Sequence, residues 1–331
     1  MAERIAVIGC GQFGIVLACH AARAGHAVSL WGRNAEEVAP LLATRRSPRL
    51  PSLEIAPSIS ITQDSRQALG GADLVLSAIP SQYARSVWRV LTDDCPRSAV
   101  IVSVAKGFEM ETLLRPSEVL HELCIGSEVV TLSGPTIATE VARGLPTALI
   151  AAGDEEGSVA RVQNALGREG WRVYCSSDQV GVEAAGAIKN VIALAAGMVD
   201  GMELGMNAKA TLLARGVAEM SRLGIALGGR RETFFGIAGV GDLATTCFSA
   251  DGRNRTLGER IGRGATCAEA LRSMDSVVEG VDTCKVVAQL ADRMGVEMPI
   301  TRAVHAVLFA GMDPRTALRS LMSRASGEER L

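Results

Sequence analysis

The stretch IAVIGCGQFGIVLACHAARAGHAVSLW, residues 5–31, decides the fold of the first half of the chain. It begins with a short apolar run, Ile5–Ile8, which predicts a strand, and continues with a glycine-rich turn, Gly9–Gly14. A helical pattern over Ile15–Ala24 follows, and Ala27–Trp31 predicts a second strand. This order of strand, G-x-G-x-x-G, helix and strand is the context that a dinucleotide-binding fingerprint requires.

The glycines of this turn have separate expected roles. Gly9 permits the tight turn, Gly11 lets the backbone approach a pyrophosphate, and Gly14 lets the helix pack closely on the strand. The N-terminus of the helix then faces the phosphate charge. A nucleotide-binding fold that serves only as an empty scaffold is the alternative interpretation of the same pattern.

The residues after the second strand bear on the choice of coenzyme. NAD-binding folds place Asp or Glu there to bind the ribose 2′-hydroxyl. Here Gly32, Arg33 and Asn34 follow the strand, and the nearest acids, Glu36 and Glu37, are expected inside the next helix. Because an arginine suits a 2′-phosphate, the sequence favours NADP(H) and leaves NAD(H) possible. A solvent-facing Arg33 is the alternative.

Strand and helix patterns alternate up to about residue 178. Further strands are expected over Asp73–Ile79, Ala99–Val104, Val129–Ser133, Thr147–Ala152 and Arg172–Ser176. Such a series predicts an α/β, Rossmann-type doubly wound sheet with ligands at the carboxyl ends of its strands. We therefore predict a dinucleotide-binding domain over residues 1–178, in which Arg45–Ser60 is a loop or lid.

Polar side chains follow two of these strands. Lys106 comes just after one strand, and Ser133–Thr136 forms a polar turn after another. A lysine on such a loop is often merely exposed. Near Lys189, however, Lys106 would complete a pair of cations around an anionic or carbonyl-bearing substrate.

The second half of the chain predicts an all-α domain over residues 179–331. Between Glu183 and Asp200, small and apolar residues are interrupted only by Lys189 and Asn190, which is typical of a buried helix. At 16 residues the stretch is too short for a membrane span, which needs about 20. Burial lowers the pKa of a lysine towards values that suit proton transfer. A lysine that extends to the surface is the alternative.

Two later segments supply further charged candidates. Asp242 lies in the apolar, glycine-rich stretch TFFGIAGVGDLATT, residues 233–246, where a carboxylate needs a partner, and Lys189 is the expected one. A helix N-cap is the alternative role for Asp242. Arg253 and Asn254 stand together at an expected helix start, where a guanidinium matches phosphate oxygens.

The composition limits the classes of function. The 331 residues are 48% hydrophobic and 21% charged, as in a globular protein, and the length favours two domains. Aromatic residues make up 3% and the net charge is −2, so nothing points to nucleic acid. Eight cysteines with no CxxC pair or histidine cluster fit free thiols in a cytoplasmic protein without a metal.

Seven collinear segments together resemble the bacterial NAD(P)-dependent sn-glycerol-3-phosphate dehydrogenase family. They are GCGQFG at 9–14, AKGFE at 105–109, SGPTIATEVARGLPTAL at 133–149, AIKNVIALAAGMVDGMELGMNAKATLLARGVAEMSRLG at 187–224, FFGIAGVGDLATTC at 234–247, GRNRTLG at 252–258 and VVEGV at 277–281. The resemblance implies hydride transfer between a nicotinamide and C2 of dihydroxyacetone phosphate or glycerol 3-phosphate, which supplies phospholipid synthesis. It also suggests a homodimer.

The resemblance implies roles for individual residues. Lys189 is the expected proton donor and acceptor at the C2 oxygen, and Lys106 and Asp242 are assigned with it to the catalytic group. The implied substrate-binding positions are Lys106, Gly134, Thr136, Lys189, Asn190, Asp242, Gly252, Arg253 and Asn254. The implied cofactor-binding positions are Gly9, Gly11, Gln12, Phe13, Gly14, Arg33, Lys106, Ala138, Arg253, Val277 and Glu279.

Four residues depart from the family pattern. Gly252 stands where Ser is usual, Gln12 replaces a small residue, Thr136 replaces a common Ser, and Ile137 replaces an aromatic residue. They leave open a paralogue that reduces a different phosphorylated or carrier-linked three-carbon ketone, which Gly252 and Ile137 suggest. A second alternative, of a different class, is a nucleotide-sensing or partner-binding protein that has lost turnover. Retention of the charged candidates argues against the second.

Overall fold

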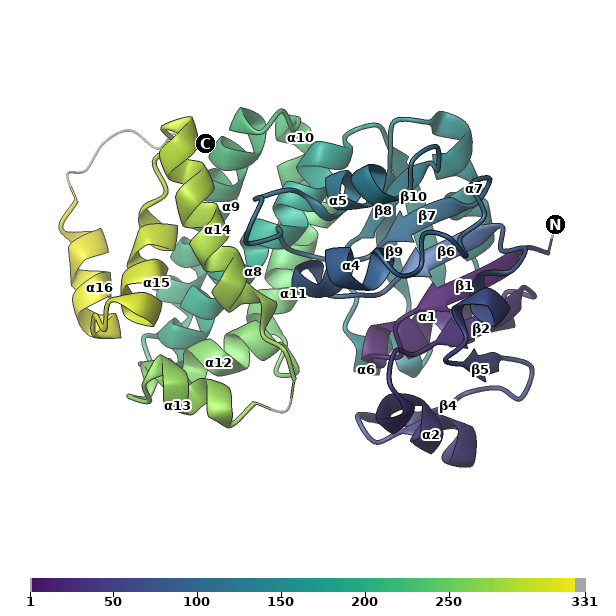
Figure 1. Ribbon diagram of the computed structural model, residues 1–331. Helices are drawn as coiled ribbons and strands as arrows, with labels where there is room; N and C mark the ends of the chain where they lie inside the picture. Colours follow the sequence, from purple (N-terminus) through teal and green to yellow (C-terminus); the bar gives the residue numbers. More distant parts are fainter. Residues whose placement is uncertain (1, 275, 325–331) are drawn as a thin grey trace. The chain divides into compact units, whose positions relative to one another are not determined.

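The computed structural model describes residues 2–274 and 276–324, so Met1, Asp275 and residues 325–331 of the predicted domains lie outside the described residues. The chain divides into two compact units, Met1–Ala105 with Arg115–Gln179, and Lys106–Leu114 with Val180–Leu331 (Figure 1). The sequence places Lys106–Leu114 with the first domain. In the structure this segment packs with the second unit, because Phe108 and Leu113 are buried in the core of that unit.

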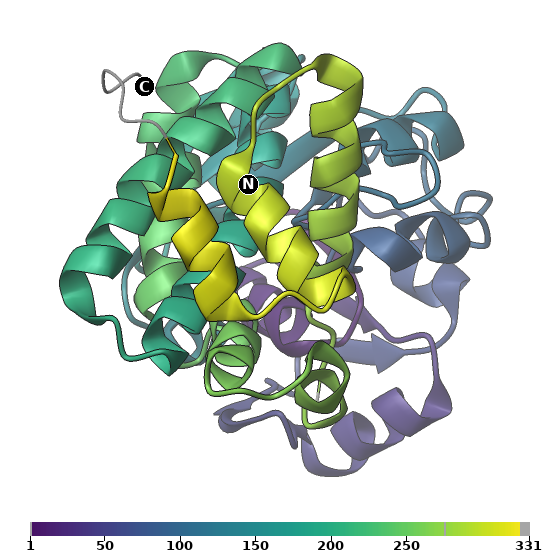
Figure 2. The ribbon, with the colours of Figure 1, turned by 90° about the vertical axis from the view of Figure 1, so that its left-hand side faces the viewer.

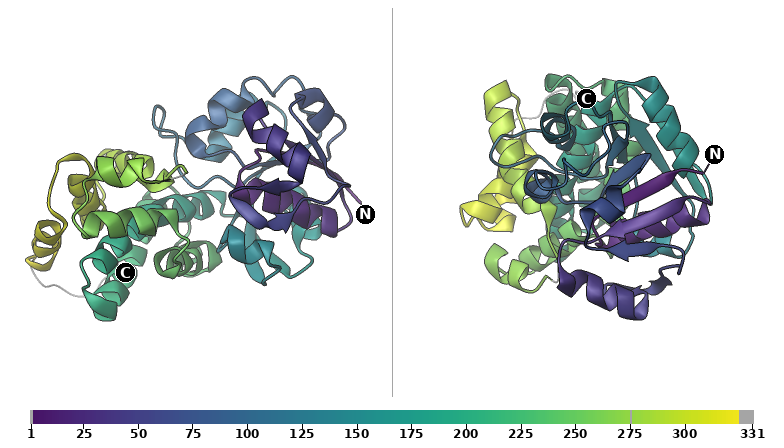
Figure 3. Two further views of the ribbon diagram at one scale, coloured as in Figure 1. Left: turned by 90° about the horizontal axis from the view of Figure 1, so that it is seen from below. Right: turned by 45° about the vertical axis from the view of Figure 1, so that its right-hand side comes forward.

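The first unit is built on an eight-stranded sheet with the order β10-β9-β8-β7-β6-β1-β2-β5 (Figure 3, right). Its strands are β1 (Arg4–Ile8), β2 (Ala27–Trp31), β5 (Ser60–Thr62), β6 (Leu74–Ser77), β7 (Val100–Ser103), β8 (Val129–Ser133), β9 (Thr147–Ala152) and β10 (Trp171–Ser176). Neighbouring strands are parallel except for β8 and β9. The predicted doubly wound sheet is confirmed, and its strand order reverses beside β1.

Helices cover both faces of this sheet. They are α1 (Gln12–Arg23), α2 (Ala35–Thr44), α3 (Ser65–Leu69), α4 (Ser81–Trp88), α5 (Pro116–Leu123), α6 (Ala138–Ala142) and α7 (Glu156–Leu166). Successive residues of a strand point to opposite faces. Val7 therefore packs in the core that contains α1 and α7, whereas Ala6 and Ile8 pack in the core that contains α3, α4 and α5. Burial on both faces explains the continuous apolar runs of the strands.

The segment Arg45–Ser60 is not simply the loop or lid that its composition predicts. It contains an antiparallel hairpin of β3 (Arg46–Ser47) and β4 (Leu50–Glu54). Gln12 Nε2 donates a hydrogen bond to the Arg49 carbonyl oxygen at 2.6 Å and ties the turn of the hairpin to α1. The hairpin was hidden in the sequence because its strands are short and rich in Pro, Ser and Arg.

The second unit is helical, as predicted, and forms around one large apolar core. Its helices are α8 (Gln179–Gly201), α9 (Gly205–Ala226), α10 (Arg231–Phe235), the π-helical turn η1 (Ile237–Gly241), α11 (Asp242–Phe248), α12 (Arg253–Gly262), α13 (Cys267–Arg272), α14 (Glu279–Met294), α15 (Pro299–Phe309) and α16 (Pro314–Met322). Figure 2 shows α14, α15 and α16 side by side, in yellow-green to yellow.

The helix α8 spans 23 residues, so the argument from a length of 16 residues against a membrane span is wrong. Among the described residues it is the one helix long and apolar enough to cross a membrane. Its most apolar 18-residue window is, however, entirely buried within the protein. Burial, rather than length, is what identifies α8 as a core helix.

Glycines let α8 and α12 meet through their backbones. A Cβ on Gly197 would lie 2.0 Å from the Arg255 carbonyl oxygen of α12, and a Cβ on Gly258 would lie 2.0 Å from the Leu194 carbonyl oxygen of α8. Such contacts are far below van der Waals distance, so any side chain at either position would separate the helices. This close crossing holds the first turn of α12 against the helix that carries Lys189.

Candidate active site

The glycine turn after β1 has the geometry that its sequence predicts. Gly9 has a φ of +108°, which L side chains rarely adopt, and a Cβ on Gly14 would lie 1.9 Å from the Gly9 carbonyl oxygen. Gly11, the N-cap of α1, is different, because nothing lies within 4 Å of its Cβ position. No contact among the described residues therefore requires glycine at position 11. The open space leaves room for a ligand to approach the backbone and the N-terminal N–H groups of α1.

Three of the predicted cofactor residues contact parts of the first unit itself. Gln12 holds the β3–β4 hairpin, as described above, and this contact accounts for the larger side chain in the glycine turn. The Phe13 ring stacks parallel to Trp171, with 6.5 Å between the ring centroids. Ala138, the first residue of α6, packs against the same core.

The end of β2 presents an arginine, and the nearest acids follow it in the first turn of α2. Arg33 is exposed directly after the strand, and Glu36 and Glu37 lie in the first turn of α2, as predicted. Glu37 Oε2 accepts a hydrogen bond from Cys10 Sγ at 3.5 Å. Burial and the neighbouring Glu37 raise the pKa of the Cys10 thiol to about 12, so this cysteine stays protonated. The exposed guanidinium of Arg33 suits a phosphate group.

The polar turn after β8 is also formed as the sequence predicts. Gly134 has a φ of +140°, and Thr136 Oγ1 donates a hydrogen bond to the Gly134 carbonyl oxygen at 3.2 Å. The Ser133 hydroxyl is buried and has no hydrogen-bond partner among the described residues. A buried hydroxyl without a partner is costly, and this one lies at the strand ends where doubly wound sheets bind ligands.

In the second unit, Asp242 joins two lysines. Lys106 Nζ lies 2.7 Å from Asp242 Oδ2, and Lys189 Nζ lies 2.9 Å from Asp242 Oδ1. The side chain of Asp242 is 2% exposed, that of Lys189 6%, and that of Lys106 16%. The predicted pairing of Lys189 with Asp242 is therefore present, and neither the surface lysine nor the N-cap alternative describes these residues.

A π-helical turn directly before Asp242 sets the direction in which its side chain points, towards the two lysines. The Gly241 N–H donates to the Gly236 carbonyl oxygen at 3.1 Å, five residues back, and α11 starts with Asp242. A Cβ on Gly239 would lie 2.0 Å from the Phe234 carbonyl oxygen, so the turn can close only with glycine there. Turns of this kind occur frequently at functional sites, because the extra residue changes the direction of the side chains that follow.

Burial lowers the pKa of Lys189 to about 8. Asp242 opposes this effect by stabilising the ammonium, whereas the positive charge of Lys106 reinforces it. The group therefore changes protonation close to neutral pH, where a general acid or base works best. The buried cluster of two amines and one carboxylate carries a net positive charge whenever both amines are protonated.

Thr246 belongs to this cluster and was missed in the sequence. Lys189 Nζ donates to Thr246 Oγ1 at 2.5 Å, and Thr246 Oγ1 donates to the Asp242 carbonyl oxygen at 2.7 Å. Thr246 lies four residues after Asp242, which places both side chains on one face of α11. That spacing was the available signal. The hydroxyl helps to fix the direction of the Lys189 ammonium.

The first turn of α12 begins with Arg253 and Asn254, the two residues predicted to bind a phosphate. Arg253 is exposed, and its Nη1 donates to the Val277 carbonyl oxygen at 2.8 Å, which connects two of the predicted cofactor positions. Glu279 is the first residue of α14.

Gly252 is the N-cap of α12, and a Cβ there would lie 3.0 Å from the Thr246 carbonyl oxygen. This tight fit gives a local reason for glycine at position 252.

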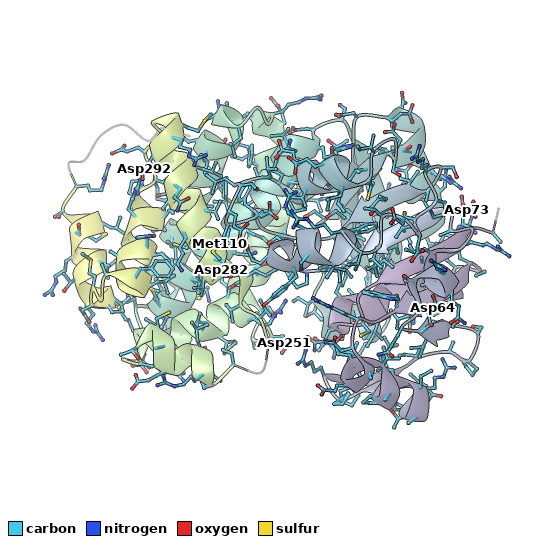
Figure 4. All side chains as sticks on the ribbon, in the orientation of Figure 1. Asp64, Asp73, Met110, Asp251, Asp282 and Asp292 are labelled. Atoms are coloured by element: carbon cyan, nitrogen blue, oxygen red, sulfur yellow. The ribbon has the colours of Figure 1, made fainter. Side chains whose placement is uncertain are left out.

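The predicted site residues thus form two groups, one in each unit. The first unit holds Gly9, Gly11, Gln12, Phe13, Gly14, Arg33, Gly134, Thr136 and Ala138. The second unit holds Lys106, Lys189, Asn190, Asp242, Gly252, Arg253, Asn254, Val277 and Glu279. Figure 4 shows the side chains of both units and labels Asp251, which precedes Gly252. Among the described residues no group of three or more His, Cys, Asp or Glu side chains is arranged to hold a metal.

Comparison with known proteins places both units of the chain in one family. A family model of the NAD-dependent glycerol-3-phosphate dehydrogenase N-terminus matches residues 4–159, and a model of the C-terminus matches residues 178–319. A glycerol-3-phosphate dehydrogenase of the NAD(P)+ type from Koribacter versatilis is 45% identical over 333 residues, which cover 99% of each chain. One from Thermoanaerobacter is 41% identical over 326 residues, which cover 98% of each chain.

A solved structure agrees with these matches. The crystal structure of glycerol-3-phosphate dehydrogenase from Coxiella burnetii superposes with a TM-score of 0.94 at 33% identity, over 98% of this chain and 99% of that one. The chain described here belongs to the NAD-dependent glycerol-3-phosphate dehydrogenase family, a family of oxidoreductases.

Proposed function

We propose that the chain interconverts dihydroxyacetone phosphate and sn-glycerol 3-phosphate, with NADP(H) favoured and NAD(H) also used. The observation that carries this proposal is the buried Lys106–Asp242–Lys189 cluster, which combines a lysine of lowered pKa with an excess of positive charge. The relatives described above are named glycerol-3-phosphate dehydrogenases of the NAD(P)+ type, which supports this proposal. Supply of glycerol 3-phosphate for phospholipid synthesis is the expected purpose.

Five side chains of the second unit have proposed roles in this reaction. Arg253 and the N-terminal N–H groups of α12 would bind the phosphate and so fix the position of C2. Lys189 would donate a hydrogen bond and then a proton to the C2 oxygen during reduction, and would remove that proton during oxidation. Lys106 would stabilise the negative charge that develops on the oxygen. Asp242 and Thr246 would hold the two ammonium groups in place.

The residues of the first unit fit a dinucleotide. The open position at Gly11, the N-terminus of α1 and the exposed Arg33 offer a backbone cradle and a cation for phosphate groups. When bound, the reduced coenzyme supplies the hydride. We propose the first unit as the dinucleotide-binding domain and the second as the substrate domain.

We also propose a homodimer in the cytoplasm, and light scattering of the purified protein measures the oligomeric state.

The pH dependence of kcat/KM should have opposite signs for reduction of the ketone and for oxidation of the alcohol. Reduction needs protonated Lys189, so its kcat/KM should be constant below pH 8 and fall above it, since the pKa of this lysine is lowered to about 8. Oxidation of glycerol 3-phosphate needs the neutral amine, so its kcat/KM should rise through the same pH. Initial rates from pH 6 to about 10 in both directions measure these profiles. Profiles of the same sign in both directions would contradict the assignment of Lys189.

Replacement of Arg33 should reduce the preference for NADP(H). In Arg33→Gln the 2′-phosphate loses a charge-assisted hydrogen bond, so kcat/KM with NADPH should fall by about tenfold to a hundredfold. The value with NADH should change by less than about twofold, because the 2′-hydroxyl gains nothing from a guanidinium. Arg23→Gln, at the far end of α1, is the matched control. Equal losses with both coenzymes would show that Arg33 does not contact the 2′-phosphate.

A substrate panel tests the proposed function. Oxidation of NADPH should be rapid with dihydroxyacetone phosphate and slower by at least about a hundredfold with unphosphorylated dihydroxyacetone, because the phosphate grip of Arg253 is then unused. A much higher rate with another phosphorylated or carrier-linked three-carbon ketone would instead support the paralogue that Gly252 and Ile137 suggest. Coenzyme binding without turnover across the whole panel would support a sensor.

A further inference from the structure

A buried hydrogen-bond chain in the second unit joins α14 to the Lys106 segment. The Gly280 N–H donates to Asn254 Oδ1 at 2.9 Å, and Asn254 Nδ2 donates to Asn190 Oδ1 at 2.9 Å. Asn190 Nδ2 in turn donates to the Lys106 carbonyl oxygen at 3.1 Å. Asn190 is 4% exposed and Asn254 9%, so water competes little for these bonds. The proposed mechanism above uses none of the three bonds.

The donor-to-acceptor direction of these hydrogen bonds is fixed at both ends of the series. The backbone N–H of Gly280 can only donate, and the carbonyl of Lys106 can only accept. Each asparagine amide between them therefore has one orientation, and the usual ambiguity between amide oxygen and nitrogen does not arise. The amide of Asn254 is thus bonded at both its oxygen and its nitrogen inside the unit. A phosphate would have only the second Nδ2 hydrogen available.

Position 280 has room only for glycine. A Cβ there would lie 2.5 Å from Asn254 Oδ1 and 2.9 Å from the Asn190 carbonyl oxygen. Gly280 is not among the residues with positive φ, so the requirement comes from space and not from backbone conformation. The atom that a side chain would displace first is the one that accepts the Gly280 hydrogen bond.

We propose that Gly280 is a positioning residue for the Lys106 ammonium and acts through Asn254 and Asn190. This inference rests on the catalytic role proposed above for Lys106. A methyl group at position 280 pushes the Asn254 amide away, and the displaced amide no longer holds Asn190 and the Lys106 backbone. Lys106 Nζ contacts Asp242 at 2.7 Å, so a shift of this segment weakens that ion pair and moves positive charge away from Lys189.

The test is Gly280→Ala, assayed in the full-length protein with dihydroxyacetone phosphate and NADPH. We expect kcat to fall by about tenfold to a hundredfold, the effect of misplacing a catalytic group by about 1 Å. We also expect the apparent pKa in the pH profile to move above about 8, because Lys106 lowers the pKa of Lys189. A purely structural change would lower the melting temperature without this upward shift. Asp282→Ala, in the same first turn of α14 (Figure 4), is the matched control and should leave both quantities unchanged.

A double-mutant cycle keeps the inference falsifiable if Gly280→Ala folds poorly. Asn254→Ala removes the amide that the new methyl group displaces, so it should show the same upward shift of the apparent pKa. Gly280→Ala added to Asn254→Ala should lower kcat by less than the product of the two single losses, because both variants disturb the same amide, although the new methyl group still approaches the Asn190 carbonyl oxygen. Losses that multiply, or a profile that stays at its wild-type position in both single variants, would overturn the inference. Wild-type protein without turnover would instead refute the proposed function, which separates the two failures.

Discussion

Lys189→Ala is expected to lower kcat for reduction of dihydroxyacetone phosphate by at least about a hundredfold, the usual minimum for loss of a general acid. The reason is geometric as well as chemical. The ammonium is buried, is held between Asp242 and Thr246, and has a pKa lowered to about 8. The dissociation constant of NADPH should stay within about twofold of wild type, since the proposed coenzyme cradle lies in the other unit.

Lys189→Arg separates proton transfer from charge. Arginine keeps the cation but does not release its proton in proteins, because its pKa exceeds about 12. If Lys189 transfers the proton, this variant should be nearly as slow as Lys189→Ala in both directions. Lys209→Met, which removes the buried lysine paired with Asp200 in the same unit, controls for loss of a buried ion pair. Recovery of most activity in Lys189→Arg would show that positive charge alone is needed.

Asp242→Asn is expected to cause the second large loss, in both stability and activity. The buried carboxylate compensates two ammonium groups, and its removal leaves both without a counter-charge at a cost of about 3–5 kcal/mol. Asp242 raises the pKa of Lys189, so its loss should move the apparent pKa of the reduction profile below about 8. Reduction at neutral pH should then fall because less of Lys189 is protonated.

The pH dependence of stability in Asp242→Asn gives an independent check. A lysine whose pKa in the folded state is below its ordinary 10.5 binds fewer protons when folded, so unfolding free energy rises with pH across that interval. The destabilisation of Asp242→Asn should therefore be greatest below the lowered pKa and smaller at high pH. Chemical denaturation at several pH values measures it. Asp200→Asn should destabilise without moving the kinetic pKa, and a constant loss in Asp242→Asn at every pH would contradict this account.

Much of the fold could be predicted because short apolar strands alternate with helical segments along the first unit. The strand–glycine–helix–strand order of residues 5–31 predicted the sheet type, and five later apolar runs marked β6 to β10. The edge strand β5 (Ser60–Thr62) was not predicted, because it has only three residues. The hairpin of β3 and β4 could not be found in this way, since the strands are short and the buried residues of β4 do not alternate with exposed ones. The assignment of Lys106–Leu114 also failed, because sequence order does not reveal that Phe108 and Leu113 are buried with the helices.

The charged part of the site was predictable for a physical reason. A lysine in an apolar helix and a carboxylate in an apolar, glycine-rich segment each need a counter-charge, so Lys189 and Asp242 were natural partners. Thr246 and Gly280 were not found, because their roles depend on one short contact each. The π-helical turn before Asp242 was equally invisible, since glycines alone do not distinguish a π turn from a loop.

Transfer of deuterium is the most direct test of the central claim, which is hydride transfer to C2 of dihydroxyacetone phosphate. The protein is incubated with this substrate and NADPH that carries two deuterium atoms at C4 of the nicotinamide, and the product is examined by NMR. We predict glycerol 3-phosphate with deuterium at C2, one deuterium atom for each coenzyme oxidised. Coenzyme oxidation without deuterium at C2, or no oxidation with this substrate, would contradict it.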